Sequence, residues 1–511
     1  MNPITAQFVF NSSESPNQFI STLYGNLNNT TDPFKGLMPA ASVAEDTSGS
    51  LYIFGQAGFN SDIVPFQGVY KISTQGAFQW QRAIGVTAPI YETIGCYDGT
   101  VDISGFPYFC GNLYFTNASG TLGSIATLVK YNSNGSLVFQ YSMRDTTFTG
   151  GLSPEMSYKA ITVDSNNNIF AAGTHIMVPD YENRGILIKY NSGGVVQWQR
   201  AIRGTNPATG MYAYIVNNAI KTDVSGDVYV GGEYINSSGG YIGALTKYNS
   251  TGTIQWQRSL LTSANGANAA NNIGVGSLEV DSQRNLYGIL IDRQNDLLTQ
   301  NVFHVFKYDT NGNLVWRKKA TLNEPDQDPT YPPYIDFGRI KLIDNENSIV
   351  VGGFYRYYDI TFNYRRSKAF IIKYSTLNGA LQYQRFFTNS YCDDSFTSSD
   401  IQLKDINVTR NSNLMNVLFA VYKYTEGAYP ASHVVSLKTN GGNLGTWTLP
   451  YSDTNSNPAT FTMTTGNIVT DATGTFTSST ITLTGVTPTY TTGTTTMTTG
   501  SSSGTPNLIM I

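Results

Sequence analysis

Two patterns of apolar and polar residues alternate along most of the chain, and each predicts a β-hairpin. The first is seen in AITVDSNNNIFAAG (160–173) and AIKTDVSGDVYVGG (219–232). Apolar residues at every second position lead into an Asp-x-x-Gly or Asp-x-x-Asn turn, and a β-branched and aromatic run follows. The second is seen in KYNSGGVVQWQR (189–200) and KYNSTGTIQWQR (247–258), which turn at Asn-Ser-x-Gly. No segment sustains helical periodicity.

The second pattern recurs about every 60 residues, which identifies one supersecondary unit copied seven times. The turn glycines of the seven copies are Gly76, Gly135, Gly194, Gly252, Gly312, Gly379 and Gly441. Two hairpins per copy give four antiparallel strands. The predicted fold is therefore all-β: a seven-bladed β-propeller over residues 40–450, in which radial repetition protects the strand edges.

The two ends of the chain lie outside this pattern. Because the units start and finish in phase, we expect the ring to close without a borrowed strand, so that residues 1–39 form a free anchoring arm. Residues 451–511 are rich in Thr, Ser and Gly, with Thr alternating with apolar residues. This favours a C-terminal β extension, either a small appendage or strands paired with a neighbouring subunit. A disordered Ser/Thr tail is the alternative.

All five tryptophans lie in or next to the second pattern, at Trp80, Trp198, Trp256, Trp316 and Trp447. A large aromatic residue at one place in each unit predicts packing between units. A ring of stacking platforms for sugars or bases is the alternative, which is less favoured because Phe139 and Tyr383 take the same position. The arginine two residues later, as in Arg200, is expected to lie over the ring or to pair locally.

The half-repeats DxxGNxYVxG and KYxxxGxxxW resemble bacterial β-propeller repeats of the SBBP type. The second is also distantly similar to the D-x-x-T-G-x-x-x-W element of quinoprotein (PQQ-like) repeats. The resemblance covers residues 40–450 and extends to some virus and phage structural proteins. It implies the propeller fold and no single activity, since such propellers serve as enzymes, adhesins and scaffolds. A quinoprotein is not expected, because the vicinal cysteine pair is missing.

Composition narrows the possible partners. The chain has 511 residues, 13% of them charged, and a formal net charge of −4. Such a weakly charged, Asn- and Thr-rich surface is typical of secreted or particle-associated β-proteins, and it offers no basic footprint for nucleic acid. The N-terminal residues do not read as a signal peptide, and no apolar stretch is long enough for a membrane span.

Residues for catalysis or metal binding are few. His175, His304 and His433 are the only histidines, and no GxSxG, P-loop or HExxH motif occurs. Zinc sites use three or four N/S ligands, so we expect no metal, no cofactor and no catalytic residues. Asp164 begins a sequence like a calcium loop, but turn capping explains it better because the closing Glu is missing. Cys96 and Cys110 are either two half-buried thiols or a cross-strand disulfide.

The longest connections between strands should share one face of a propeller, where binding usually occurs. Two of them stand out: NEPDQDPTYPPY (323–334) and YRYYDITFNYRRSK (355–368). Either they pair with each other and solubilise the rim, or they form a contact site for carbohydrate or protein. The candidate ligand-binding residues are Tyr331, Tyr334, Tyr357, Tyr358, Tyr364, Arg365 and Arg366.

We therefore expect a non-enzymatic structural or attachment protein at the surface or tail of a virion. It would dock through 1–39 and 451–511 onto other proteins of the particle or onto a second copy, and contact host glycan through the long loops. The alternative is a secreted bacterial adhesin or lectin-like propeller. An enzyme of the quinoprotein or polysaccharide-cleaving kind is a third hypothesis.

Overall fold

The fold is known from a computed structural model of the chain. The structure describes residues 20–23, 37–57, 66–74, 76–85, 91–116, 122–145, 155–177, 182–205, 212–213, 216–235, 241–262, 273–292, 302–322, 334–359, 364–389, 399–409, 414–423, 431–442, 445–452, 458–465, 469–473, 476–479, 484–486, 490–493, 498–500 and 509–510. All regular elements in these ranges are β-strands. No helix of the length and hydropathy needed to cross a membrane occurs in them.

Six units are antiparallel meanders of four strands, named here the first to the sixth unit. The first three are β2 (Leu37–Glu45), β3 (Leu51–Ala57), β4 (Phe66–Ile72) and β5 (Phe78–Gly85); β6 (Tyr91–Val101), β7 (Pro107–Thr116), β8 (Leu122–Tyr131) and β9 (Leu137–Asp145); and β10 (Glu155–Val163), β11 (Ile169–Met177), β12 (Glu182–Tyr190) and β13 (Val196–Thr205). The short β14 (Tyr212–Ala213) pairs with the end of β13.

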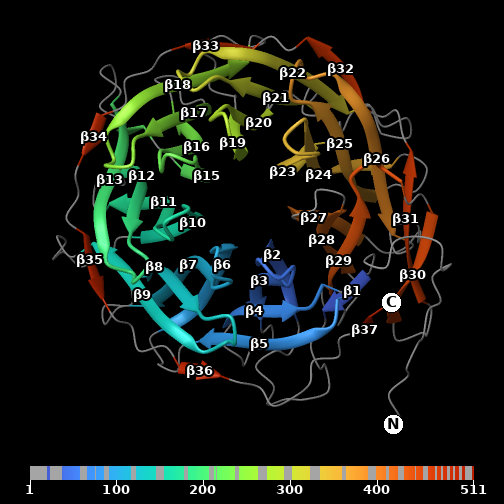
Figure 1. The fold of residues 1–511 in the computed structure, drawn as a ribbon, viewed down its shortest axis with the longest axis horizontal. Coiled ribbons are helices and arrows are strands. Elements are labelled where there is room, and N and C mark those ends of the chain that lie inside the picture. Colours follow the sequence, from blue (N-terminus) through green and yellow to red (C-terminus); the bar gives the residue numbers. More distant parts are fainter. Residues whose placement is uncertain are drawn as a thin grey trace.

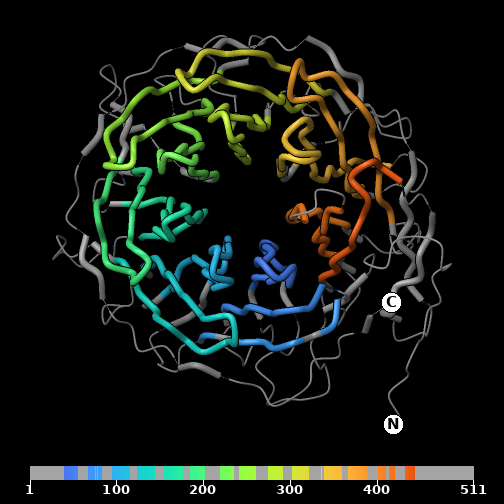
Figure 2. Tube along the Cα trace, in the orientation of Figure 1, coloured from blue at the N-terminus to red at the C-terminus, as the bar shows by residue number. Residues whose placement is uncertain are grey.

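The next three units repeat the same order. They are β15 (Val216–Thr222), β16 (Val228–Ile235), β17 (Tyr241–Tyr248) and β18 (Ile254–Thr262); β19 (Ile273–Val280), β20 (Leu286–Asp292), β21 (Val302–Tyr308) and β22 (Leu314–Leu322); and β23 (Tyr334–Ile343), β24 (Ser348–Asp359), β25 (Tyr364–Ser375) and β26 (Leu381–Asn389). Figure 1 shows the units arranged radially, with the first strand of each nearest the centre and the fourth outermost. Figure 2 shows the chain passing once around this ring, from blue to orange.

The seventh unit is built from both ends of the chain. Its first three strands are β27 (Ser399–Val408), β28 (Leu414–Lys423) and β29 (Ala431–Lys438), and its fourth is β1 (Ile20–Leu23), antiparallel to β29. The expected fourth strand, β30 (Gly445–Ser452), instead pairs with β31 (Pro458–Thr465) beside the sixth unit. The expectation of a ring without a borrowed strand is therefore wrong, and residues 20–23 belong to a sheet rather than to a free arm.

The C-terminal residues add a further strand to every unit, running backwards around the ring. We call β31 to β37 the C-terminal strap. Its later strands are β32 (Val469–Thr473), β33 (Phe476–Ser479), β34 (Thr484–Val486), β35 (Tyr490–Gly493), β36 (Thr498–Gly500) and β37 (Ile509–Met510). In this order the seven strands pair antiparallel with β26, β22, β18, β13, β9, β5 and β1. Figure 1 shows them at the periphery. These residues therefore pair within their own chain.

The hydrophobic core consists of clusters between consecutive units. One cluster, for example, joins Phe170 and Leu187 of the third unit to Val230 and Tyr248 of the fourth. Equivalent clusters join each of the first six units to the next. The all-β sheets around one centre are compatible with a β-propeller-like fold.

In the third, fourth and fifth units an Asp carboxylate holds the turn between the first two strands. Asp164 Oδ1 accepts the backbone N–H groups of Asn166 at 2.9 Å and of Asn168 at 2.8 Å. Asp223 and Asp281 accept equivalent bonds from their own turns. These carboxylates cap turns, which accounts for the sequence that resembles a calcium loop.

Candidate functional site

The repeated tryptophans lie between neighbouring units. Trp256 of the fourth unit donates its Nε1–H to the Thr310 carbonyl of the fifth at 3.2 Å, and its ring packs between Tyr229 and Tyr308. Trp80, Trp198 and Trp316 make the same bond to the next unit. Tyr383 takes this place in the sixth unit and donates its hydroxyl to the Thr439 carbonyl at 3.0 Å. For Trp447 the structure describes backbone pairing with Phe461 in β30 and β31.

The arginine and lysine of the motif reach the same neighbouring turn. Arg258 lies over the Trp256 ring at 5.4 Å and donates its Nε–H to the Gly312 carbonyl at 2.7 Å. Lys247 Nζ lies 3.5 Å from the Thr310 carbonyl. Gly312 has a φ of +76°, and a Cβ there would come within 2.8 Å of Trp256. The motif therefore recognises its own turn in the next unit, and we call this set of contacts the inter-unit lock.

The predicted ligand-binding residues do not gather in one described site. Tyr331 lies outside the described residues, and for Tyr334, Tyr364 and Arg365 only backbone pairing is described. Tyr357 is 4% exposed and packs in the core against Tyr355. Tyr358 is half-buried, and the buried Arg366 pairs with Asp359 at 3.4 Å.

These residues also occupy strands rather than a long loop. The segment expected to be a loop at 355–368 is mostly the pairing of β24 with β25, which continues to Asp359↔Tyr364. The alternating aromatic residues extend this hairpin because they suit a pleated surface. Most of the other long connections, including 323–333, lie outside the described residues. The placement on a loop is thus wrong for Tyr357, Tyr358, Tyr364, Arg365 and Arg366, while their binding role stays a prediction.

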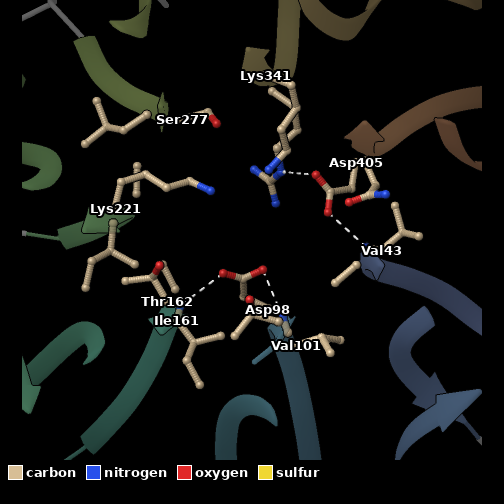
Figure 3. Close-up of a pocket in the computed structure, with 18 of the residues that line it drawn as sticks. Val43, Asp98, Val101, Ile161, Thr162, Lys221, Ser277, Lys341 and Asp405 are labelled. Atoms are coloured by element: carbon tan, nitrogen blue, oxygen red, sulfur yellow. Dashed lines mark hydrogen bonds and ion pairs between the residues drawn. The ribbon is translucent and has the colours of Figure 1, made fainter. Parts of the chain in front are cut away.

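A polar cavity of about 260 Å³ lies at the centre of the ring and is lined by the first strands of all seven units. Its charged lining residues are Glu45, Asp98, Lys159, Lys221, Arg339, Lys341 and Asp405. Figure 3 shows Asp98 and Lys221 pointing into this space from different sides, with Asp405 across the space from Lys221. We call it the axial cavity.

Two lysines share one carboxylate on one wall of the axial cavity. Lys221 of β15 and Lys341 of β23 both lie 3.0 Å from Glu279 Oε1 of β19. Burial lowers the pKa of Lys221 although Glu279 opposes this effect. Burial would also lower the pKa of Lys341, but the carboxylates of Glu279 and Asp405 outweigh it and raise that pKa. We call these three residues the Lys–Glu–Lys triad; with all three ionised, it carries one net positive charge.

Asp98 and Asp405 are built alike but are neutralised differently. Each carboxylate accepts two backbone N–H groups. One comes from the residue that follows the Asp, and the other comes from a residue in the first strand of the next unit. The Asp98 carboxylate accepts the backbone N–H of Gly99 at 2.9 Å and that of Ile161 at 3.0 Å. The Asp405 carboxylate accepts the backbone N–H groups of Ile406 and Val43, both at 2.9 Å. It also forms an ion pair with Arg339 at 3.4 Å. Among the described residues no cation lies within ion-pair distance of Asp98. Burial raises its pKa, and Arg339 counters only part of this rise.

Lys159 lines the cavity from a β-bulge in β10, where its Nζ lies 3.6 Å from the centre of the Tyr97 ring. Burial lowers the pKa of this lysine to about 8. A fraction of it is therefore uncharged near neutral pH, unlike an exposed lysine.

None of the cysteines and histidines that the structure describes lines the axial cavity. Cys96 and Cys110 are both buried free thiols, and Cys110 pairs across the strands with Asp98 rather than with Cys96. Burial raises the pKa of both thiols. His304 and His433 are buried in the third strands of two units. No group of His, Cys, Asp and Glu in the described part of the chain is arranged to hold a metal ion.

Sequence reasoning missed the axial cavity, although a signal for it is present. Charged residues interrupt the apolar alternation of the first strands in SYKAITVD (157–164), AIKTD (219–223) and SLEVD (277–281). A charge there can reach the centre of the ring, because the first strand of each unit lies nearest the centre. These charges differ from unit to unit, and so a search for repeats passes over them.

No protein-family model and no curated protein matches the chain. Solved structures similar to it include a protein of unknown function from Dyadobacter fermentans DSM 18053, at 10% identity and a TM-score of 0.36, covering 82% of this chain and 98% of that one. Polysaccharide lyase Uly1 has 8% identity and a TM-score of 0.40, with coverage of 84% and 94%. A GH43_12 retrieved from a capybara gut metagenome has 11% identity and a TM-score of 0.25, with coverage of 88% and 98%. At these TM-scores the similarities carry no argument about the function of this chain.

Proposed function

We propose that this chain is a closed seven-bladed β-propeller that serves as a non-enzymatic structural and attachment component of a particle, such as a virion, or of an extracellular surface. Each of the seven units would be one blade, and β1 would supply the outer strand of the seventh. The C-terminal strap carries the proposal, because it joins all the blades from outside.

Contacts between the first and seventh units support closure of the ring. Ala40 N–H donates to Ser432 Oγ at 3.0 Å, and Val43 N–H donates to Asp405 Oδ2 at 2.9 Å. Asn407 Nδ2 donates to Glu45 Oε2 at 3.1 Å. Pairing of β1 with β29 adds a second link between the two ends of the ring. A ring held at its seam by both side chains and a borrowed strand resists opening there.

The strap supports a role that demands durability. It pairs with the outermost strand of every unit. Because one segment pairs with all seven units, no unit can detach without losing strap pairing as well. Such a connection slows unfolding, which matters most where a protein cannot be refolded or replaced.

The strap also offers a means of docking. Among the described strands, β33 pairs only with β18, and β32, β34, β35 and β36 likewise pair on one side only. Their second edges face away from the ring, where a strand of a neighbouring protein or of a second copy can add. Docking through the C-terminal residues would thus occur by strand addition at the rim, rather than through a separate appendage.

The test is to follow the full chain in particles purified from its source by density gradient. We expect stoichiometric incorporation. Thr477→Pro in β33 removes a backbone donor opposite Leu261 and should reduce incorporation at least several-fold, while Thr477→Val keeps the strand and should behave as wild type. A chain found only outside particles would contradict the proposal. Glycan binding by that unassembled chain would support the adhesin alternative.

A further inference from the structure

The axial cavity is the strongest unassigned feature of the molecule, and it is small. Its volume of about 260 Å³ lies just below the roughly 300–1,000 Å³ of sites that hold drug-sized ligands. Its lining comes from seven different strands, each held within a sheet, so the positions of the charged groups are fixed before any ligand arrives. A small polar molecule fits such a site.

One side of the cavity presents a carboxylate, that of Asp98, which has no cation at ion-pair distance among the described residues. Two backbone N–H groups hold Asp98 in place, and a carboxylate has about four acceptor positions, so part of its capacity is unused. Asp405 is an internal comparison, since it has the same two backbone donors and Arg339 in addition. What Asp98 lacks relative to Asp405, among the described residues, is a cation at ion-pair distance, since Arg339 acts on Asp98 only from further away.

Another side of the cavity presents excess positive charge. Glu279 neutralises only one of the two lysines that it contacts, and Lys221 points from there into the cavity (Figure 3). An ammonium group has three donors, of which the contact with Glu279 uses one. A carboxylate of a ligand is the natural partner for the others, because charge-assisted hydrogen bonds are the stronger ones.

We propose that the axial cavity binds a small zwitterion, whose ammonium group pairs with Asp98 and whose carboxylate pairs with Lys221. Such a ligand supplies both missing charges and adds no net charge to the cavity. A simple anion would meet Asp98, and a simple cation would meet Lys221, Lys341 and Arg339. Free amino acids have this chemistry, and the separation of their two charged groups sets which of them fits. This inference stands apart from the attachment role.

The test is isothermal titration of the full chain with a panel of α-amino acids and of ω-amino acids, whose charges lie further apart. Matched carboxylates without the amine and matched amines without the carboxylate are the comparison ligands. We expect binding by one zwitterionic class and at least about 10-fold weaker binding by both comparison sets. Binding of the carboxylates as tight as that of the amino acids, or no binding by any zwitterion, would overturn the proposal.

Two variants test which residues bind the two charged groups of the ligand, and a third variant is the control. Lys221→Met leaves the Lys341–Glu279 pair intact, so the fold should persist while affinity falls at least about 10-fold. Asp98→Asn should lower affinity to a similar degree. Asp309→Asn, in an outer turn whose carboxylate bonds only its own Asn311 and Asn313, is the control and should bind as wild type. Unchanged affinity in folded Lys221→Met would remove the carboxylate assignment and with it the proposal.

Discussion

The inter-unit lock and the axial cavity are two interfaces made by the same seven units, yet they follow opposite rules. The lock repeats: an aromatic donor and an arginine reach the same carbonyls of the next unit, as Trp198 and Trp256 do. The cavity does not repeat around the whole ring, because the charged residues differ among most of the first strands, as Asp98, Lys221 and Arg339 do. The repeated contacts of the lock hold neighbouring units together, whereas the varied charges of the axial cavity can form a binding site.

The two interfaces also differ in electrostatics. In the lock, an aromatic residue bonds a backbone carbonyl of the next unit, so losing that aromatic residue leaves a neutral group without its donor. The cavity concentrates ionised groups away from bulk water, where removing one partner leaves the other charge poorly neutralised. Single substitutions should therefore cost more at the axis than at the lock.

The largest effect is expected from Glu279→Gln, which leaves Lys221 and Lys341 without their shared carboxylate. Breaking a buried pair costs about 3–5 kcal/mol, and partial exposure of both lysines places the loss near 3 kcal/mol. The measurement is the free energy of unfolding in urea at neutral pH. The loss should shrink only as pH rises above about 10.4, where an ordinary lysine loses its proton, since the raised pKa of Lys341 contributes stability only while that lysine is protonated.

Removing one of the two cations provides the control for Glu279→Gln. Adding Lys221→Met to that variant should restore part of the lost free energy, because only one uncompensated ammonium group remains. If Glu279→Gln costs less than a lock substitution, or if Lys221→Met destabilises it further, the axis is not the more sensitive interface.

Trp256→Ala should have the second largest effect. It removes a ring packed against Tyr229 and Tyr308 and a hydrogen bond to the next unit. Because the ring is only half-buried, we expect a loss of about 2 kcal/mol in the free energy of unfolding, less than a buried tryptophan would cost. The urea midpoint measures it.

Trp256→Tyr is the matched variant for the lock, since Tyr383 makes the same bond in the sixth unit. It should cost less than about 1 kcal/mol. An equal loss in the Tyr and Ala variants would show that the lock depends on indole shape rather than on an aromatic ring with a donor.

The repeated features of the molecule can be predicted from the sequence, whereas the features that do not repeat are harder to predict. The alternating hairpins and the positions of turn glycines such as Gly312 suffice to predict four antiparallel strands per unit, because period and turn chemistry act locally. They do not predict that β1 rather than β30 pairs with β29, since both segments can form strands and only the closed arrangement of the chain decides between them. The strap is a similar case: its β-prone alternation was visible, whereas its partners were not.

The candidate site was predicted less well because its chemistry is non-local. Asp98 and Lys221 are more than 100 residues apart in the sequence and approach each other only through the ring. Conversely, the run of Tyr and Arg at 355–366 looked like a binding loop, whereas Tyr357 packs in the core and Arg366 pairs with Asp359. Aromatic residues at every second position serve strand packing as readily as recognition.

The smallest expected effect is a change in the free energy of unfolding with pH. It comes from histidines buried in the sheets and not from residues of the lock or of the axial cavity. Burial lowers the pKa of His304 to about 3, with help from Lys319 and Arg317, and that of His433 to about 4. In the unfolded chain each histidine takes up a proton near pH 6.5, so stability falls as pH drops from about 6.5 toward about 4. Each should cost about 1 kcal/mol between about pH 7 and pH 5.5.

The measurement is the difference in the free energy of unfolding between the two pH values. A loss of stability that a substitution causes equally at both pH values cancels in this difference. His433→Gln should remove about half of that difference, whereas Trp256→Tyr should leave it unchanged. Glu279, whose pKa its two lysines lower against the effect of burial, contributes stability that is lost only further into acid. Acid should therefore weaken the sheets first and the axis later, and a full pH slope in His433→Gln would contradict this order.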